Sequence, residues 1–207
     1  MQKLIEIFNE IEKHLMEDLE PSEYLNSLID QGTFGEYPFS MLSGLIKIEQ
    51  SQQHHPEGNV WRHTMMVLDN AALRRNLSKD SRVFMWSALL HDLGKAPATK
   101  IRKGKITAYD HDKLGEDLAI HFLKEFDQEQ DFINKVAAMV RWHMQILYVV
   151  KNLPFANIKG MLSQVPIEEI ALLSLCDRMG RGEMDNEKIL EEEENVRVFI
   201  EKCKNNS

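Results

Sequence analysis

The chain has 207 residues, a length at which one domain with a full hydrophobic core is expected. Its 11 Met and 9 Phe, against 10 Gly and 6 Pro, favour a helical globule over a sandwich or barrel. The formal net charge of −8 excludes a surface built as a whole to bind nucleic acid.

Two features indicate the compartment. Cys176 and Cys203 are too few for a disulfide framework and suit a reducing cytosol. The N-terminus is amphipathic and contains acidic residues, unlike a signal peptide, and no apolar run reaches the length of a membrane span. We therefore expect a cytoplasmic protein without a membrane partner, and the oligomeric state stays open.

Helical periodicity recurs along the sequence and predicts an all-α fold, a single-domain helical bundle. In chain order, we expect helices at about 4–19, 22–32, 39–48, 59–76, 80–93, 111–126 and 129–149, a short helix after Pro154, a helix after Pro166, and a last helix at 186–202. Residues 99–107 lack the helical period and predict a loop or a short β-ribbon.

Four residues can close around one metal ion: His63, the adjacent pair His91 and Asp92, and Asp177. Imidazole nitrogen with carboxylate oxygen suits Mn²⁺, Fe²⁺, Co²⁺, Ni²⁺ or Zn²⁺ better than Ca²⁺ or Mg²⁺. Such a site binds a water, lowers its pKa and holds a phosphoryl oxygen beside it. The pattern therefore predicts a hydrolase of phosphate esters with one ion, and room for a second.

The surroundings of the His91-Asp92 pair strengthen this interpretation. An apolar helical run ends at the pair, Gly94 is expected to be a left-handed residue at the helix C-terminus, and Pro97 is expected to prevent continuation. A carboxylate at that helix end opposes the helix dipole, which a bound cation would compensate. Asn59 is the predicted N-cap of the helix that carries His63.

Asp177, the distal acid, is predicted to bind the metal, but an arginine could be its partner instead. Asp177 follows the apolar run Leu172–Cys176, so its carboxylate is expected to be partly buried. A buried carboxylate needs a metal ion or an arginine. Arg178 or Arg181 could be that arginine, which keeps a purely structural role open.

These residues resemble the HD-domain superfamily of metal-dependent phosphohydrolases, which is defined by a His, a His-Asp pair and a distal Asp. Longer motifs are similar to the HD domain of bacterial CCA-adding tRNA nucleotidyltransferases. They are His54 to His63, Leu89 to Lys95, Asp110 to Asp112 with Gly115, Val140 to His143, and Asp177 to Gly182. The resemblance runs from roughly Gly35 to Gly182. It implies 2′,3′-cyclic phosphodiesterase, 2′-nucleotidase and phosphatase activity.

One part of that family's chemistry is not expected. Nothing before His54 offers a Gly-Ser loop with a paired-carboxylate strand, and Asp110 and Asp112 bracket His111 inside the HD region. CCA addition is therefore not predicted. The expected organisation is N-terminal helices over 1–50 that pack on the core, an HD domain over 51–185 and a C-terminal helix over 186–207.

Four more histidines are candidates for positions in or near the cleft. His111 opens a predicted helix, where a surface histidine is ordinary, and His143 lies on an inward stripe where a core histidine is an equal alternative. The resemblance implies a pocket role for both, with a second metal bridged by Asp92. His54 and His55 are expected near the entrance of the cleft, without a chemical role.

A group of basic residues directly follows the His-Asp pair in this acidic chain and can steer an anion toward a metal cleft. They are Lys95, Lys100, Arg102, Lys103 and Lys105. For Arg102 and Lys103, a solvated loop tip is the better explanation.

The phosphate-binding residues predicted beside the metal are Lys95 and the arginines that flank Asp177. Lys95 lies three residues after Asp92 and can reach a bound phosphoryl oxygen. Either Arg178 or Arg181 can clamp a phosphate with two hydrogen bonds.

The predicted function is hydrolysis of a small phosphorylated nucleotide or an RNA 3′ end by a metal-activated water. Asp92 orients that water and can accept its proton, and Lys95 offsets the charge on the phosphoryl oxygens. Two alternatives stay open: a non-catalytic module that binds a nucleotide or a protein, and a di-iron oxygenase of the HD fold. The complete ligand set argues against the first, and iron analysis with spectroscopy distinguishes the second.

Overall fold

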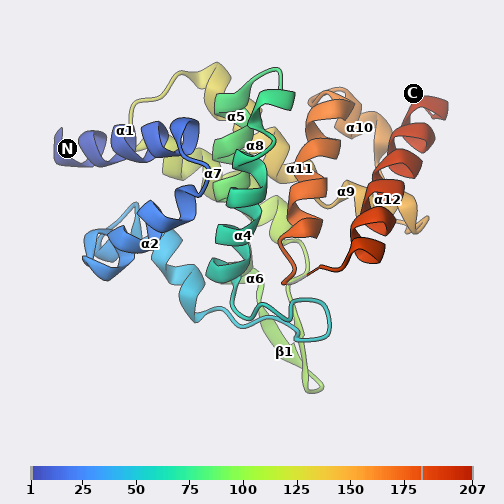
Figure 1. Ribbon diagram of the computed structural model, residues 1–207, viewed down its shortest axis with the longest axis horizontal. Coiled ribbons are helices and arrows are strands. Elements are labelled where there is room, and N and C mark those ends of the chain that lie inside the picture. The colour runs from blue at the N-terminus through green and yellow to red at the C-terminus, as the bar shows by residue number, and fades with distance from the viewer. Residues whose placement is uncertain (1, 183, 207) are drawn as a thin grey trace.

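The computed structural model describes residues 2–182 and 184–206; residues 1, 183 and 207, which the expected domain ranges include, lie outside them. The described chain is helical apart from a small two-stranded sheet (Figure 1), which confirms the predicted all-α class with a β-ribbon near 99–107. None of the described helices combines the length and apolarity that a bilayer crossing requires.

The elements alternate between long helices and short connecting turns. The longer helices are α1 (Gln2–Glu17), α2 (Pro21–Asp30), α4 (Val60–Ala72), α5 (Ser81–Leu90), α7 (His111–Lys124), α8 (Gln130–Trp142), α11 (Ile167–Met179) and α12 (Asn186–Asn205). The shorter elements are η1 (Thr33–Gly35), α3 (Ser40–Ser43), η2 (Gly44–Lys47), η3 (Arg75–Leu77), α6 (Lys95–Ala98), β1 (Lys100–Arg102), β2 (Lys105–Thr107), α9 (Gln145–Val150) and α10 (Ile158–Leu162).

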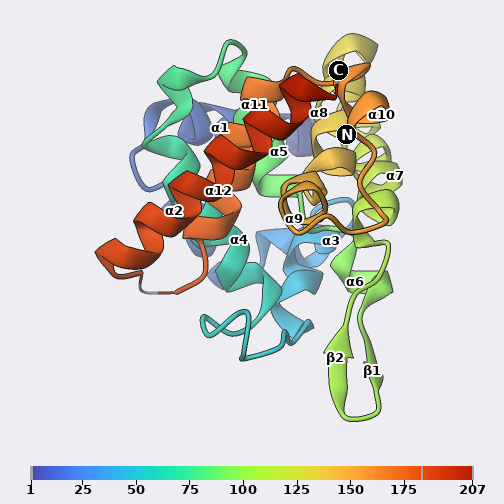
Figure 2. The ribbon, with the colours of Figure 1, turned by 90° about the vertical axis from the view of Figure 1, so that its right-hand side faces the viewer.

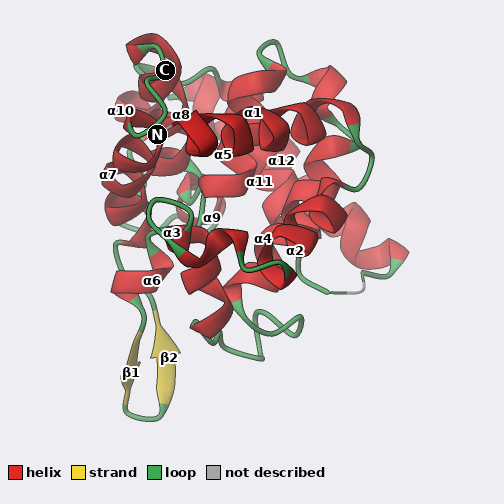
Figure 3. Cartoon of the chain, turned by 90° about the vertical axis from the view of Figure 1, so that its left-hand side faces the viewer, coloured by secondary structure: helices red, strands yellow, loops and turns green. Residues whose placement is uncertain are grey.

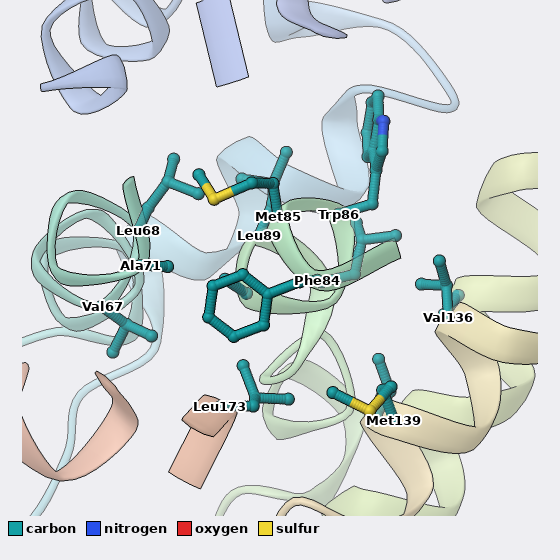
Figure 4. Close-up of a cluster of buried hydrophobic side chains, with 14 of the residues drawn as sticks. Val67, Leu68, Ala71, Phe84, Met85, Trp86, Leu89, Val136, Met139 and Leu173 are labelled. Carbon is teal, nitrogen blue, oxygen red and sulfur yellow. The ribbon is translucent and has the colours of Figure 1, made fainter. Parts of the chain in front are cut away.

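Helix α5 lies at the centre of the fold, because every residue from Val83 to Leu90 is buried. A helix that is apolar on all sides is stable only when other helices surround it. Figure 4 shows Phe84 of α5 in a cluster with side chains of α4, α8 and α11. The labelled neighbours from those helices are Val67, Leu68, Ala71, Val136, Met139 and Leu173. The His91-Asp92 pair directly follows α5, so the most rigid part of the core fixes its position.

Helices α4 and α5 both start at side-chain caps, and the cap at Asn59 was predicted. The side chain of Asn59 accepts a hydrogen bond from the backbone N–H of Arg62, which confirms it as the N-cap of α4. Asp80 caps α5 in the same way, through the N–H of Val83.

The chain after the His-Asp pair differs from the prediction. Gly94 has a φ of −65°, so it is not a left-handed residue. A Cβ atom at Gly94 would lie 1.9 Å from the carbonyl oxygen of His111, so this glycine is required for a close approach between the loop and α7. Pro97 does not prevent a helix either: it lies in the short helix α6, where a first-turn proline is tolerated.

The helix predicted at 129–149 is also wrong, since it is broken into α8 and α9. His143 is the C-cap of α8, and its Nδ1 donates to the carbonyl of Val140 over 2.6 Å. No glycine or proline marks this break, so the hydrophobic period runs through it. His143 itself keeps helical φ and ψ values of −58° and −28°, and its side chain is buried, as its place on the inward stripe predicts. The helix expected at 39–48 is likewise divided, into α3 and η2.

Strands β1 and β2 form an antiparallel hairpin that projects from the helical body (Figures 2 and 3). Its turn residues, Lys103 and Gly104, have φ values of 49° and 73°. Positive φ at both turn positions is typical of the tight two-residue turns whose twist suits a hairpin.

Candidate metal centre

Six residues proposed from the sequence meet at one place in the interior. They are His63, His91, Asp92, His111, His143 and Asp177. None of them is more than 6% exposed. They lie within or next to α4, α5, α7, α8 and α11, so the fold gathers side chains that are far apart in the sequence.

Asp92 lies between two pairs of histidines. Its Oδ2 is 3.3 Å from Nε2 of His91 and 3.7 Å from Nε2 of His63. Its Oδ1 is 3.5 Å from Nε2 of His111 and 3.8 Å from Nε2 of His143. We name His63, His91 and Asp92 the first cluster, and Asp92, His111 and His143 the second cluster. The potential ligand atoms of each cluster lie within 4.8 Å of one another.

Three of the imidazoles are oriented in the same way. His91, His111 and His143 each donate from Nδ1 to the backbone carbonyl three residues earlier, over 2.8, 2.8 and 2.6 Å. A carbonyl only accepts, so Nδ1 carries the proton and Nε2 of the neutral ring keeps its lone pair. All three lone pairs therefore face Asp92, as metal ligands do.

Two observations show that these Nε2 atoms lack a suitable protein partner. Nε2 of His91 is buried and has no hydrogen-bond partner among the described residues. Nε2 of His111 lies 3.2 Å from Nε2 of His143, so two lone pairs face each other. Two nitrogens bound to one tetrahedral zinc lie about 3.4 Å apart, given Zn–N bonds of about 2.1 Å. The donor set therefore fits a divalent cation.

His63 is held from behind by a carboxylate. Its Nδ1 lies 2.8 Å from Oε1 of Glu57 and 3.1 Å from the carbonyl oxygen of Gly180. Its Nε2 lies 3.1 Å from Oδ1 of Asp177, which joins that acid to the first cluster. A carboxylate behind a histidine fixes the tautomer and raises the basicity of the ligand nitrogen.

Sequence reasoning missed Glu57, which is 4% exposed. The same Oε1 also lies 2.8 Å from Nδ1 of His55, expected near the entrance. Burial raises the pKa of Glu57, but the hydrogen bonds to His55 and His63 outweigh it and lower the pKa to about 2. Its position inside the His54–His63 motif was the only signal available.

The histidines of the second cluster are prepared to act as neutral ligands. Burial, together with nearby His111 and His91, lowers the pKa of His143 to about 4. Burial also lowers the pKa of His111, against the opposing charge of Asp92. At neutral pH neither imidazole has to lose a proton before it binds a metal.

The two aspartates are held in the ionised form. Burial raises the pKa of Asp92, but Lys95 and His91 outweigh it and hold the pKa well below the ordinary value. Burial acts on Asp177 in the same direction, and Arg181 and His63 outweigh it there. Both carboxylates are thus charged at neutral pH.

Lys95, one of the proposed phosphate-binding residues, lies directly beside Asp92. Nζ of Lys95 lies 2.7 Å from Oδ2 of Asp92, at ion-pair distance without hydrogen-bond alignment. The same Nζ donates to Oε1 of Gln50 over 2.7 Å, a contact that the sequence did not reveal.

The two arginines next to Asp177 have different partners. Nη2 of Arg181 lies 3.6 Å from Oδ1 of Asp177, beside the first cluster. Arg178 donates from Nε to Oε2 of Glu192 over 2.6 Å, so its guanidinium is held by helix α12. Arg181 is therefore the arginine placed to act at the metal centre.

A cavity of about 480 Å³ adjoins the metal centre, within the usual range for small-molecule sites. It is lined by Asp92 and Asp177 and by the histidines of the second cluster, while His63 and His91 are not among its described lining residues. Cations on its walls are Lys95, Lys151, Arg178 and Arg181, and apolar wall residues include Ile106, Met144, Leu147 and Leu153. The cavity thus offers positive charge for an anionic group and an apolar wall for the rest of a ligand. Lys151 was not anticipated from the sequence.

Comparison with known proteins agrees with this geometry. The family model for the HD domain matches residues 60–191. The multifunctional CCA protein of Azoarcus sp. (strain BH72) is 29% identical over 185 residues, which cover 85% of this chain and 42% of that protein. The multifunctional CCA protein of Pasteurella multocida (strain Pm70) is 33% identical over 112 residues, 53% of this chain and 25% of that protein.

A third relative, the multifunctional CCA protein of Halorhodospira halophila, is 29% identical over 184 residues and shows the same coverage as the first. The chain therefore spans less than half the length of the curated relatives that it matches. The matched family region contains the histidines and aspartates of both clusters. With a model that spans more than half of its residues and a helical fold that gathers these ligands, the chain belongs to the HD-domain family, a superfamily of metal-dependent phosphohydrolases.

Proposed function

We propose that the chain hydrolyses phosphate esters of nucleotides or RNA ends, as a 2′,3′-cyclic phosphodiesterase, 2′-nucleotidase or phosphatase. The observation that carries this proposal is the arrangement of four buried imidazoles around Asp92, with Nε2 of each directed at the carboxylate. A purely structural core would not need two lone pairs facing each other over 3.2 Å.

The residues that would hold the metal are those of the two clusters, with Asp177 beside the first. Mixed nitrogen and oxygen donors suit Mn²⁺, Fe²⁺, Ni²⁺, Co²⁺ or Zn²⁺. The first cluster would hold one ion, and the second cluster supplies ligands for another, with Asp92 shared between them. A divalent ion there lowers the pKa of a water and polarises a phosphoryl oxygen.

The remaining work falls to side chains of this protein. Asp92, ionised at neutral pH, orients the attacking water and accepts its proton. Lys95 and Arg181 provide positive charge where the phosphoryl oxygens gain negative charge. Gln50 and Glu57 act one step away: Gln50 fixes the ammonium of Lys95, and Glu57 fixes the ring of His63.

A metal-supplemented activity screen tests the proposal. The purified protein, loaded in turn with Mn²⁺, Fe²⁺, Co²⁺, Ni²⁺ or Zn²⁺, is assayed on 2′,3′-cyclic nucleotides, 2′- and 3′-nucleotides and an aryl phosphate. We expect turnover that a chelator abolishes and added metal restores. No turnover of any substrate by fully metallated protein would overturn the proposal and leave a binding module.

A second candidate rests on the shared position of Asp92. Two clusters joined by one carboxylate could also hold two irons, as a di-iron oxygenase would require. Iron content, electronic spectra and oxygen consumption distinguish this function from hydrolysis. Substrate-dependent oxygen uptake without phosphate release would favour the oxygenase.

A further inference from the structure

The β1–β2 hairpin concentrates positive charge away from the metal centre. Lys100, Arg102, Lys103 and Lys105 are all exposed, within six positions of a chain whose net charge is −8. None of these four cations forms an ion pair with an acidic side chain in the described part of the chain. Cations that the protein itself does not neutralise remain available for an anionic ligand.

The strand register gathers these cations on one face. Lys100 is paired with Thr107, and Arg102 with Lys105, so three cations share the face opposite the Ile101–Ile106 pair. The guanidinium of Arg102 lies 5.6 Å from the ring centroid of Tyr109, which is 66% exposed. We name Lys100, Arg102, Lys105 and Tyr109 the basic face.

The base of the hairpin is part of the cavity wall. Thr99, Ile106, Thr107 and Ala108 all line the cavity. The carbonyl of Ala108 also accepts the hydrogen bond from Nδ1 of His111, so the end of the hairpin is tied to the second cluster. Figure 2 shows the β1–β2 hairpin extending away from the helices. Thr107 shares the face of Lys100 and lines the cavity, whereas Ile106 lines it from the other face of the hairpin. A ligand on the basic face therefore meets the cavity at Thr107.

We propose that the basic face binds the backbone of single-stranded RNA, while the cavity receives only the 3′-terminal nucleotide. This inference rests on the proposed function for the chemistry at that terminus. Successive cations along a strand suit successive phosphates, and an exposed aromatic ring beside an arginine gives a base a surface on which to stack. A cavity of about 480 Å³ suits one small ligand, so the preceding nucleotides must lie outside it.

Charge and shape together favour RNA over an acidic peptide. A peptide would match the cations, but it would give no role to Tyr109 or to a cavity that ends at metal ligands. Because the chain is acidic as a whole, binding to nucleic acid is confined to this hairpin and to strands that end at the cavity.

A direct binding measurement tests the inference. The probe is a 5′-fluorescein-labelled single-stranded oligoribonucleotide with a 3′-terminal phosphate, followed by fluorescence anisotropy across a salt series. The variant Lys100→Ser/Arg102→Ser/Lys105→Ser should bind it roughly 10- to 100-fold more weakly at low salt. The slope of log K against log salt should become shallower by about 2, the value for three lost contacts to a single strand.

A matched control removes three exposed lysines elsewhere: Lys3→Ser/Lys13→Ser/Lys124→Ser. It changes the net charge equally and should bind like the wild type. Tyr109→Ala should weaken binding about tenfold and leave the salt slope unchanged, because stacking releases no counterions. Equal loss in the control and the hairpin variant would overturn the inference, as would equally tight binding of poly-glutamate.

Turnover separates this inference from the proposed function. For an oligoribonucleotide with a 2′,3′-cyclic end, kcat/KM of the hairpin variant should fall as its affinity does. For a 2′,3′-cyclic mononucleotide, kcat should not change and kcat/KM should fall much less, because only long-range steering is lost. Equal values for wild type and variant on both substrates would overturn the role of the hairpin and leave the hydrolase intact. Hairpin-dependent RNA binding without any wild-type turnover would overturn the hydrolase and leave the hairpin as the RNA site.

Discussion

The metal centre and the basic hairpin are both charged, but the charged groups of the centre are buried and paired, whereas those of the hairpin are exposed and have no acidic partner in the described chain. At the centre, each imidazole is held by a carbonyl or carboxylate, and the ionised Asp92 is held by Lys95. On the hairpin, the cations project into solvent without acidic partners in the described chain. A buried charge is costly unless protein groups pair with it, so its partners are in place before a ligand binds. An exposed cation is solvated by water and needs no protein partner until an anionic ligand binds. Residues of the centre should therefore control metal binding and kcat, and hairpin residues should control only the affinity for long ligands.

The largest effect is expected from Asp92→Asn, at the carboxylate that both clusters share. The amide keeps the shape but loses the negative charge and one of two acceptor oxygens, so neither cluster remains complete. We expect metal content to fall to a trace and activity to fall below detection. Elemental analysis, an activity assay and circular dichroism on the same samples check this. Loss of helical content would instead indicate a structural role for Asp92.

The two clusters can be separated by His111→Ala/His143→Ala. This variant removes the imidazoles of the second cluster and leaves His63, His91 and Asp177 in place. Under saturating supply, metal content should fall to about one ion per chain, because the first cluster keeps its donors. Elemental analysis beside the wild type gives the answer. Equal content in both proteins would mean that the two histidines bind no ion of their own.

Lys95→Ala removes a positive charge beside the metal centre without removing a metal ligand. Nζ of Lys95 lies beside Asp92 but has no lone pair when protonated, so the substitution should leave metal content unchanged. Loss of one electrostatic partner of a transition state typically lowers turnover about 10²- to 10³-fold. We expect kcat on a cyclic or 2′-phosphorylated nucleotide to fall by that factor, with little change in KM. Full activity would exclude Lys95 from catalysis.

Features set by neighbouring residues in the sequence could be predicted, whereas contacts between residues far apart in the sequence could not. The His91-Asp92 pair and the cap at Asn59 are short-range features, so their identity and approximate position could be predicted. Gln50 reaches Lys95 across 45 positions, and no spacing rule connects the two. The break between α8 and α9 could not be predicted, because no glycine or proline marks it in the sequence. Motifs therefore identified the residues that the fold gathers around Asp92, but not the residues that orient them.

Glu57→Gln tests one of the residues that the sequence did not single out. The amide can still accept a hydrogen bond from His63 but no longer stabilises the proton on Nδ1 by charge. Loss of such a carboxylate behind a metal-binding histidine typically lowers metal affinity about 10- to 100-fold. A metal titration by competition with a chromophoric chelator measures this. Activity at saturating metal should stay near that of the wild type, and unchanged affinity would show that Gly180 alone orients the ring.

The smallest effects are expected from the two arginines next to Asp177, which form a matched pair. Arg181 lies beside the first cluster, so Arg181→Ala should raise KM for a nucleotide about tenfold, the equivalent of one charge-assisted hydrogen bond. Arg178 is engaged by Glu192 on α12, so Arg178→Ala should leave KM unchanged and lower Tm by a few degrees. Steady-state kinetics and thermal unfolding on both variants distinguish the two roles. The opposite result, in which Arg178→Ala raises KM and Arg181→Ala lowers Tm, would mean that a bound phosphate draws Arg178 away from Glu192 and that Arg181 serves mainly to neutralise Asp177.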